Sequence, residues 1–348
     1  MIPTIVALLM GAACVGGGGM ETDAMNSGSA SSSDTEAGTG SSTATTDPTS
    51  GTSGTSGTSG TSGTSGTSGT SGTSGTSGTS GTSGTTETTG PTDTEGGLGG
   101  CASGDPAPGL WCPAPGVSWQ WQIDGKAIDT SIEVDMYDVD LFEVSDAELS
   151  TLKTDGRIVI CYFSAGSYEE WRADAADFPE AALGEPLDGW PGERWLDIRD
   201  PGVREVQAAR LDLAAARGCD GVEPDNVDGY VNSSGFALTG GDQIDYNLWL
   251  ATQAHARGLS VGLKNDLDQI AALVLAFDWA LNEECAAYEE CELLTPFIED
   301  GKAVFNVEYV DEIAEGPGLA DAVCDGALGL GFSTLIKEWD LGPWRIAC

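Results

Sequence analysis

An uninterrupted Gly-Thr-Ser repeat occupies residues 51–83 and limits what this chain can fold into. None of its side chains can bury much apolar surface, so nothing offsets the entropy that ordering would cost. The repeat also lacks proline and any hydrophobic position, which argues against a collagen helix or a solenoid. Residues 15–100 keep this Gly, Ser and Thr composition. We therefore expect them to form a disordered tether with a reach of roughly 50 Å.

An apolar run at residues 2–13 precedes the tether. It has the length of the apolar part of a signal peptide and is too short to span a bilayer. Gly11, Ala12 and Ala13 stand directly before Cys14, an arrangement that resembles a bacterial lipobox. We expect residues 1–14 to direct export to the outer surface or the extracellular space. Cys14 is the predicted site of a lipid anchor, which would be the chain's only membrane contact, and simple secretion is the alternative.

The chain is strongly acidic, with 55 Asp and Glu against 14 Lys and Arg and a formal charge of -41. Eight of the acids and none of the bases lie in the first hundred residues, so the remainder has a net charge of -33. Such a field repels phosphate and anionic headgroups, which argues against nucleic acid as a partner. It favours a cationic partner, although solubility or a high-salt habitat would also explain it.

Every Trp, and every Cys except Cys14, lies beyond residue 100, so we expect residues 101–348 to form one folded, monomeric domain. The single histidine excludes a His-rich zinc site and any mechanism that needs two histidines. Eight cysteines remain after Cys14, and an even number in an exported chain suggests disulfides. Closeness in sequence favours Cys101–Cys112 and Cys285–Cys291, and Cys324–Cys348 is plausible. Cys161 and Cys219 either pair or stay buried thiols.

Short apolar runs alternate with helical segments through this domain, which is typical of a parallel sheet covered by helices. The expected strands are 119–123, 134–141, 158–163, 195–198, 221–224, 259–263, 279–282, 303–307 and 328–332. Nine runs are one too many for the (β/α)8 barrel that we predict, and 119–123 and 328–332 are the weakest barrel candidates. A doubly wound sheet is the alternative, although no Gly-x-Gly-x-x-Gly turn follows any strand.

Three helices have clear end signals. Ser145 and Glu148 form a capping box before a helix that we expect to end near Gly156. Asp200-Pro201 is expected to open a helix that closes at Gly218, and Asp242 one that closes at Gly258.

Polar clusters follow four of the expected strands at their C-terminal ends, where barrel enzymes build their active sites. The clusters are residues 164–167, 223–228, 264–266 and 282–285. Carboxylates packed this densely cannot all keep ordinary pKa values, which is the condition that separates a general acid from a nucleophile. For any single acid, capping of the following helix is the alternative.

Five strings in unbroken order resemble the endo-α-1,4-polygalactosaminidase family, glycoside hydrolase family 114. They are Trp-Gln-Trp-Gln-Ile at 119–123, Ile-Cys-Tyr-Phe-Ser-Ala-Gly at 160–166, Trp-Leu-Asp-Ile-Arg at 195–199, Gly-Cys-Asp-Gly-Val-Glu-Pro-Asp-Asn-Val-Asp-Gly-Tyr at 218–230 and Asn-Glu-Glu-Cys at 282–285. The resemblance implies a (β/α)8 barrel that cleaves internal α-1,4 bonds in galactosamine-rich polymers, with two carboxylates and neither metal nor cofactor. It favours Asp225 as nucleophile and Glu283 as acid/base, with retention of configuration.

Chemistry alone supports a pair of carboxylates, since one must protonate the leaving oxygen while the other attacks or activates water. The predicted substrate-binding residues are Trp119, Trp121, Tyr162, Asp197, Glu223, Asn226, Asp228, Tyr230, Lys264, Asn265, Asn282 and Glu284. The aromatic residues among them, and Trp171, either stack on sugar rings or belong to the core. Lys264 either acts near the leaving oxygen or bridges acids structurally.

The expected substrate is a cationic or partly deacetylated amino-sugar polysaccharide. Two alternatives stay open, a sugar-binding protein without turnover on the same barrel and a hydrolase of another α-linked amino-sugar polymer.

Overall fold

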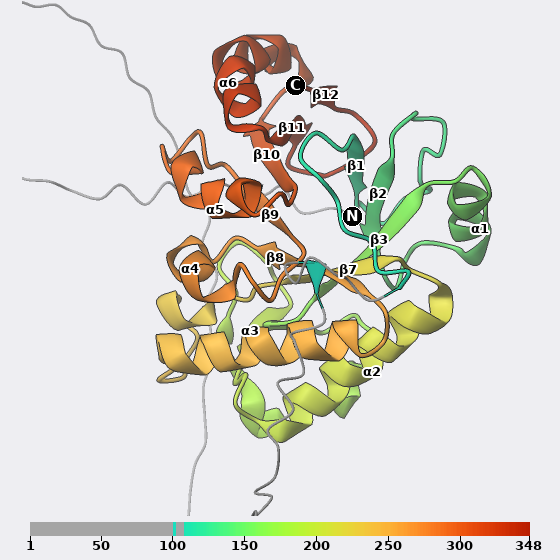
Figure 1. Ribbon diagram of the computed structural model, residues 1–348. Coiled ribbons are helices and arrows are strands. Elements are labelled where there is room, and N and C mark those ends of the chain that lie inside the picture. Colours follow the sequence, from blue (N-terminus) through green and yellow to red (C-terminus); the bar gives the residue numbers. More distant parts are fainter. Residues whose placement is uncertain (1–99, 102–107) are drawn as a thin grey trace, which may run out of the picture. The chain divides into compact units, whose positions relative to one another are not determined.

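The structure, a computed structural model, describes residues 100–101 and 108–348 (Figure 1). The predicted signal peptide, lipobox cysteine and tether lie outside the described residues. None of the helices in the described part of the chain combines the length and the apolar composition needed to cross a bilayer.

Eight parallel strands form one sheet and follow each other in chain order. They are β1 (Trp119–Gln122), β2 (Met136–Asp140), β3 (Ile158–Ser164), β7 (Gly221–Asp225), β8 (Ser260–Lys264), β9 (Trp279–Glu283), β10 (Val304–Val310) and β11 (Ser333–Glu338). A short antiparallel strand, β12 (Ile346–Ala347), borders β11. The order never reverses, as it would in a doubly wound sheet, so that alternative is wrong.

The first and last parallel strands contact each other through side chains. The Trp119 indole on β1 donates to the carbonyl of Ser333 on β11 at 2.9 Å, and Lys337 Nζ donates to the carbonyl of Trp121 at 2.7 Å. The sheet therefore curls until its ends meet, which confirms the predicted (β/α)8 barrel class.

Helices lie on the outside of this sheet (Figure 1). They are α1 (Asp146–Thr154), α2 (Pro201–Arg217), α3 (Gly240–His255), α4 (Ile270–Leu273), α5 (Thr295–Glu299) and α6 (Gly316–Leu330). The Ser145 capping box and the helix from Asp200 to a left-handed Gly218 are confirmed. The predicted start at Asp242 is wrong, because Thr239 caps α3 and Asp242 is the third helical residue, whose carboxylate completes the capping box.

Two of the nine predicted strands are not barrel strands. The predicted strand 195–198 overlaps β6 (Glu193–Leu196), which pairs with β4 (Ser167–Glu169) and β5 (Leu183–Pro186) in a separate antiparallel sheet. This sheet is formed by the stretch of chain that connects β3 to β7. The run 328–332 mostly continues α6, whose apolar last turn ends at the left-handed Gly331, and β11 begins only at Ser333. The run at 119–123, which we expected to be weak, supplies the first barrel strand.

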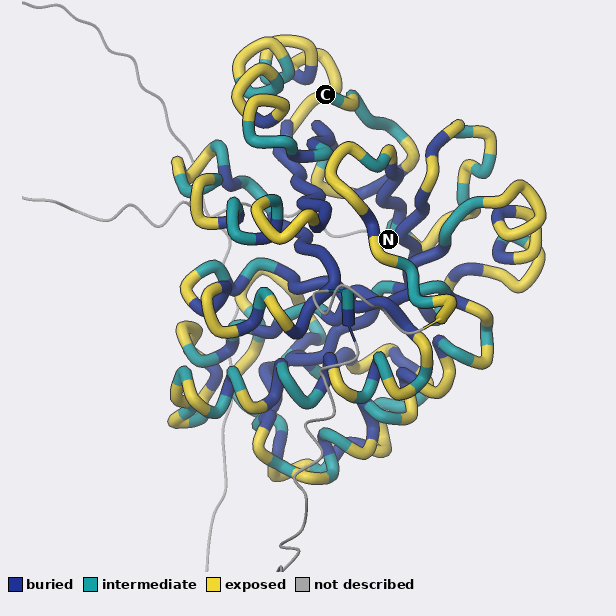
Figure 2. Tube along the Cα trace, in the orientation of Figure 1, coloured by how far each residue is buried: buried dark blue, intermediate teal, exposed yellow. Residues whose placement is uncertain are grey.

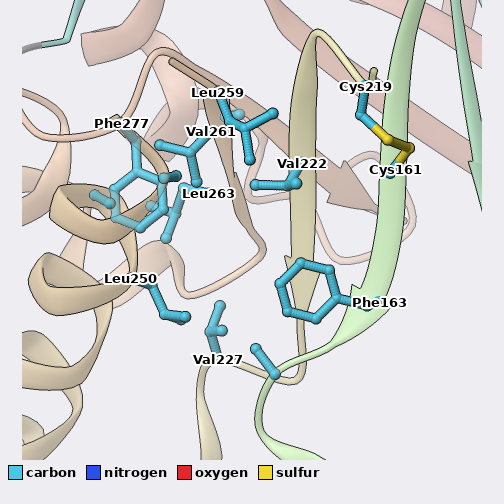
Figure 3. Packing of buried hydrophobic residues seen from close by; sticks show 14 of the residues in the cluster. Cys161, Phe163, Cys219, Val222, Val227, Leu250, Leu259, Val261, Leu263 and Phe277 are labelled. Carbon is cyan, nitrogen blue, oxygen red and sulfur yellow. A yellow bond between two sulfur atoms is a disulfide. The ribbon is translucent and has the colours of Figure 1, made fainter. Parts of the chain in front are cut away.

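Buried hydrophobic residues form one cluster inside the barrel and another outside it. In Figure 2 the barrel strands are accordingly dark blue, that is buried, along most of their length. Trp119, Met136, Trp279 and Phe305 belong to the inner cluster. The outer cluster packs alternate strand residues against the helices, and Figure 3 shows Val261 and Leu263 beside Phe277, with Val222 on the neighbouring strand. Successive strand residues point to opposite faces, so every second residue of each barrel strand is left for the interior.

Four disulfides connect the eight cysteines beyond the tether. Cys101–Cys112, Cys285–Cys291 and Cys324–Cys348 are confirmed. Cys161 and Cys219, whose state the sequence left open, also form a disulfide, which ties β3 to the residue two positions before β7 (Figure 3).

Candidate active site

The interior of the barrel is apolar in its lower layers and polar near the C-terminal ends of the strands. On β7, Val222 packs outside while Glu223 and Asp225 alternate with it and face inward. The same alternation turns Lys264 of β8 and Glu283 of β9 into the interior, where the contacts described next bring them together. The strand pattern thus gathers residues that are up to 60 positions apart in the sequence into one site.

Lys264 is the centre of this site. Its ammonium lies 3.0 Å from Glu223 Oε1, 3.2 Å from Asp225 Oδ1 and 3.2 Å from Glu283 Oε2, and its side chain is only 2% exposed. It also lies 4.8 Å from the centre of the Trp121 ring. Although burial lowers the pKa of Lys264, the surrounding carboxylates raise it well above its ordinary value. The lysine is therefore a fixed positive charge that holds the two proposed catalytic acids together.

Each of these two acids also accepts a hydrogen bond from a tyrosine. Tyr162 Oη donates to Asp225 Oδ2 at 2.9 Å, and Tyr309 Oη donates to Glu283 Oε1 at 2.5 Å. The Tyr309 ring stacks on Trp339 with 4.1 Å between ring centres. Burial raises the pKa of both tyrosines well above the usual value, so both keep the proton that they donate.

The residues directly after β7, β8 and β9 have left-handed backbone conformations. Asn226, Asn265 and Glu284 have φ values of 60°, 49° and 61°. Asn226 donates to Ser164 Oγ at 2.9 Å, and Asn265 donates to Glu283 Oε2 at 3.1 Å while accepting from the Glu283 backbone N–H at 3.0 Å. Non-glycine residues rarely adopt this conformation, and such residues concentrate at functional sites. Here the turn lets Asn265 fix the Glu283 carboxylate.

Two pockets open at this end of the barrel. The larger, about 620 Å³, is lined by residues at or after the C-terminal ends of β1, β2, β3, β10 and β11 and by residues of the antiparallel sheet, among them Tyr162, Trp171, Trp190 and Trp339. The smaller, about 290 Å³, is lined by residues at the ends of β7, β8 and β9, including Glu283, Asn265 and Tyr230. Glu283 lines the smaller pocket, and Asp225, which lines neither, accepts a hydrogen bond from Tyr162 of the larger one.

Acidic side chains dominate both linings. The larger pocket has eight acids and two bases, and the smaller has five acids and no base. Burial raises the pKa of Glu193 in the larger pocket to about 7 and that of Asp228 in the smaller to about 6. Within the larger pocket, Arg172 forms ion pairs with Asp140 and Glu169 at 2.7 Å each. Acids thus outnumber bases in both linings, where a ligand would bind.

Most of the predicted site residues meet in this region, and two do not. Asp225, Glu283, Tyr162, Glu223, Asn226, Asp228, Tyr230, Lys264, Asn265, Asn282 and Glu284 lie in the cluster, in its turns or in the pocket linings. Trp119 is 1% exposed inside the barrel and cannot reach a sugar. Asp197 forms an ion pair with Arg199 at 2.8 Å, outside both pocket linings. Trp121, also 1% exposed, contacts Lys264 inside the barrel and cannot stack on a sugar either.

Sequence analysis missed Tyr309, Trp339 and Asp138. The predicted strand 303–307 stopped short of Tyr309, because β10 continues to Val310. Trp339 follows β11, which begins at Ser333, whereas the predicted strand 328–332 lies mostly in α6. Asp138 lies in the middle of β2, inside the barrel and fully buried, and the predicted strand 134–141 also contains Asp135 and Asp140, so the sequence does not single Asp138 out.

One group of side chains in the described ranges could bring three metal-ligating atoms together, namely Cys285, Cys291 and Glu308. The two cysteines already form a disulfide, so they have no thiolate to offer a metal.

The sequence profile of glycoside-hydrolase family GH114 matches residues 102–348. The chain belongs to this family. This GH114 chain is therefore a glycoside hydrolase, as the five strings indicated.

Two solved structures relate to this GH114 chain at different distances. Aspergillus fumigatus Ega3 in complex with galactosamine is 44% identical, with a TM-score of 0.66 over 68% of this chain and 97% of that one. The glycoside hydrolase domain of PelA from Pseudomonas aeruginosa is 15% identical, with a TM-score of 0.53 over 67% of this chain and 98% of that one, and supports the fold only. A comparison with curated protein sequences gave no match.

Proposed function

We propose that this protein hydrolyses internal α-1,4 bonds of a galactosamine-rich polysaccharide. The observation that carries the proposal is the pair of carboxylates, Asp225 and Glu283, held on one buried ammonium, with Glu283 in the lining of one pocket and the Tyr162 partner of Asp225 in that of the other. The relationship to Ega3, whose structure contains galactosamine, supports the sugar.

Asp225 acts as the nucleophile and Glu283 as the general acid and then the general base. Asp225 Oδ1 and Glu283 Oε2 both lie 3.2 Å from Lys264 Nζ, so these two oxygens are at most 6.4 Å apart. Retaining enzymes keep their carboxyl groups about 5–5.5 Å apart, whereas inverting enzymes need about 6.5–9.5 Å to admit a water molecule. The bound on this oxygen pair supports retention.

Cleavage within the polymer, and not at its end, fits the two pockets. One contains Tyr162, the hydrogen-bond partner of Asp225, and the other contains Glu283 itself. Sugar units bound in both pockets would place the bond between them at the carboxylates. Trp171 and Trp190, each 50% exposed, and Trp339 offer apolar faces in the larger pocket on which pyranose rings can stack.

The acidic linings favour a polymer with free amino groups. Thirteen acids against two bases attract an ammonium-bearing chain and repel an anionic one. This supports a partly deacetylated substrate over a fully acetylated one.

Export fits the covalent structure. Four disulfides within one domain are typical of proteins that fold in an oxidising compartment. We infer an extracellular or surface location, with Cys14 as the point of lipid attachment and residues 15–100 as the tether.

The test is to digest partly deacetylated α-1,4-polygalactosamine with the full chain and to follow the products by mass spectrometry. Asp225→Asn and Glu283→Gln should release none, while Glu205→Gln, an exposed acid on α2, should match the wild type. A ladder of products from the wild type and the control alone supports the proposal.

Three other outcomes contradict it in different ways. Binding of the polymer without products indicates a sugar-binding protein. If products form only from another α-linked amino-sugar polymer, that polymer is the substrate instead. Full activity of either carboxylate variant removes that residue from the mechanism.

A further inference from the structure

Three carboxyl oxygens deep in the barrel have no hydrogen-bond donor among the described residues. They are both oxygens of Asp138 on β2 and Oε2 of Glu223 on β7, and both residues are 0% exposed. A buried acceptor without a donor is costly, and a buried carboxylate without a counter-charge is more so. The nearby cation, Lys264, is already within 3.2 Å of three carboxylates, which include Glu223 but not Asp138.

The carboxyl groups of Asp138 and Glu223 contact each other. Two carboxylates cannot hydrogen-bond to each other unless one of them carries a proton, since ionised carboxylates only accept. Like charges that share a dry site keep one proton between them for the same reason. One proton shared between the two carboxyl groups accounts for two of these three oxygens, the one that carries it and the one that accepts it.

Trp121, the register partner of Asp138 on β1, does not replace this proton. Its indole N–H is also buried without a hydrogen-bond partner in the described part of the chain. A single N–H could serve one of the three oxygens and would leave two, whereas the shared proton accounts for two and leaves one. Burial raises the pKa of Asp138 well above its ordinary range, and repulsion by Glu223 adds to this.

We propose that Asp138 is a positioning residue of the active site, which holds one proton in a hydrogen bond to Glu223. With the proton in place the pair carries one negative charge, and Lys264 stays shared between Glu223, Asp225 and Glu283. Without it, a second buried negative charge would draw Lys264 toward the pair and away from the two proposed catalytic acids. The proposal rests on the proposed function where it concerns catalysis, and on the geometry alone where it concerns the proton.

The charged and titratable groups that face the pair come from four strands. Tyr162 on β3, Asp225 on β7, Lys264 on β8 and Tyr309 on β10 all interact with Glu223 electrostatically. Lys264 and Asp225 also act on Asp138. Lys264 is the cation of this set. Loss of the shared proton at alkaline pH is expected to add a second negative charge to the pair of Asp138 and Glu223, so the single ammonium would face one more carboxylate.

Infrared difference spectroscopy of the full chain tests the proton without any substrate. The wild type minus Asp138→Asn spectrum at pH 7 should contain the C=O stretch of a protonated carboxylic acid. Asp140→Asn is the matched control on the same strand. Because Arg172 binds both Asp140 oxygens, the wild type minus Asp140→Asn spectrum should contain carboxylate bands instead. A wild type minus Asp138→Asn spectrum with carboxylate bands alone overturns the proposal, whatever the enzyme's activity.

Activity then tests the positioning role. The amide that Asp138→Asn introduces can still donate to Glu223 but cannot lose a proton in the working range. This variant should therefore keep kcat near the wild-type value and extend activity to higher pH. Asp138→Leu removes the donor and should lower kcat at least about fivefold with little change in KM, since a buried acceptor loses its partner. Equal kcat losses in both variants, or an unchanged alkaline limb in Asp138→Asn, contradict the proposal.

Discussion

Replacing Lys264 by methionine is expected to destabilise the barrel strongly at neutral pH. The lysine is buried with three carboxylate oxygens within 3.2 Å, and methionine fills a similar volume without the charge. At an effective dielectric constant of about 20, each contact contributes a gross attraction of roughly 5 kcal/mol, before desolvation is subtracted. Removing one partner from a buried ion pair costs about 3–5 kcal/mol net. In a domain of this size that corresponds to a fall in Tm of about 10 °C.

The loss should depend on pH in a definite direction. Without Lys264, neighbouring carboxylates such as Glu223 take up protons more readily in the folded state than in the unfolded state, so their folded pKa values rise further above the unfolded ones. Burial already raises the pKa of Glu223. An acid with a raised folded pKa loses stability as pH rises from its unfolded pKa to its folded one. The destabilisation of Lys264→Met should therefore be larger at pH 7 than at pH 5.

Thermal unfolding at both pH values, followed by circular dichroism, measures the effect. Lys302→Met is the matched control, because Lys302 is equally buried but contacts one carboxylate, Asp300, at 2.8 Å. If Lys264→Met unfolds no earlier than Lys302→Met, or loses as much stability at pH 5 as at pH 7, the central role of the lysine charge is refuted.

Three further predictions follow from individual contacts. Tyr309→Phe should lower kcat about tenfold, because a hydrogen bond to a charged group is worth about 1.5–3 kcal/mol, while Tyr168→Phe, at a half-buried position outside both pocket linings, should leave the rate unchanged. Burial raises the pKa of Asp266 to about 8, so the wild type should lose stability as pH rises from about 4 to 8. Asp266→Asn should flatten that loss in pH-dependent unfolding, and asparagine tolerates the left-handed φ of 46° at this position. For a deacetylated substrate, kcat/KM should fall steeply with ionic strength because salt screens the acidic pockets, whereas a fully acetylated oligomer, where it is cleaved, should show a flat profile; a flat profile for both would contradict electrostatic attraction.

The barrel could be predicted from the sequence because its outer face follows simple rules. Alternate strand residues such as Val222, Val261 and Leu263 pack under helices, and capping signals at Ser145 and Asp200 mark where helices begin. The errors occurred where local pattern and tertiary context disagree. The apolar end of α6 has the composition of a strand, and β6 has one too, but it pairs in a separate sheet.

The candidate site was predictable where acids follow a strand and not where they lie within one. Asp225 and Glu283 stand at strand ends in recognisable strings. Asp138 alternates with Tyr137 and Val139 on β2, a pattern that is typical of a strand with one solvated face. In the barrel that polar face points inward, and only the position of Glu223 and Lys264 across the interior gives Asp138 a role.

The most direct test of the mechanism is the anomeric configuration of the first product, observed by proton NMR in a fresh digest of partly deacetylated α-1,4-galactosamine oligomers. With Asp225 as nucleophile and Glu283 as acid/base, two inversions at the anomeric carbon release the α-anomer first, and the β-anomer appears only by later mutarotation. Initial release of the β-anomer would mean direct attack by water, and would contradict the role of Asp225 that the shared contact with Lys264 supports.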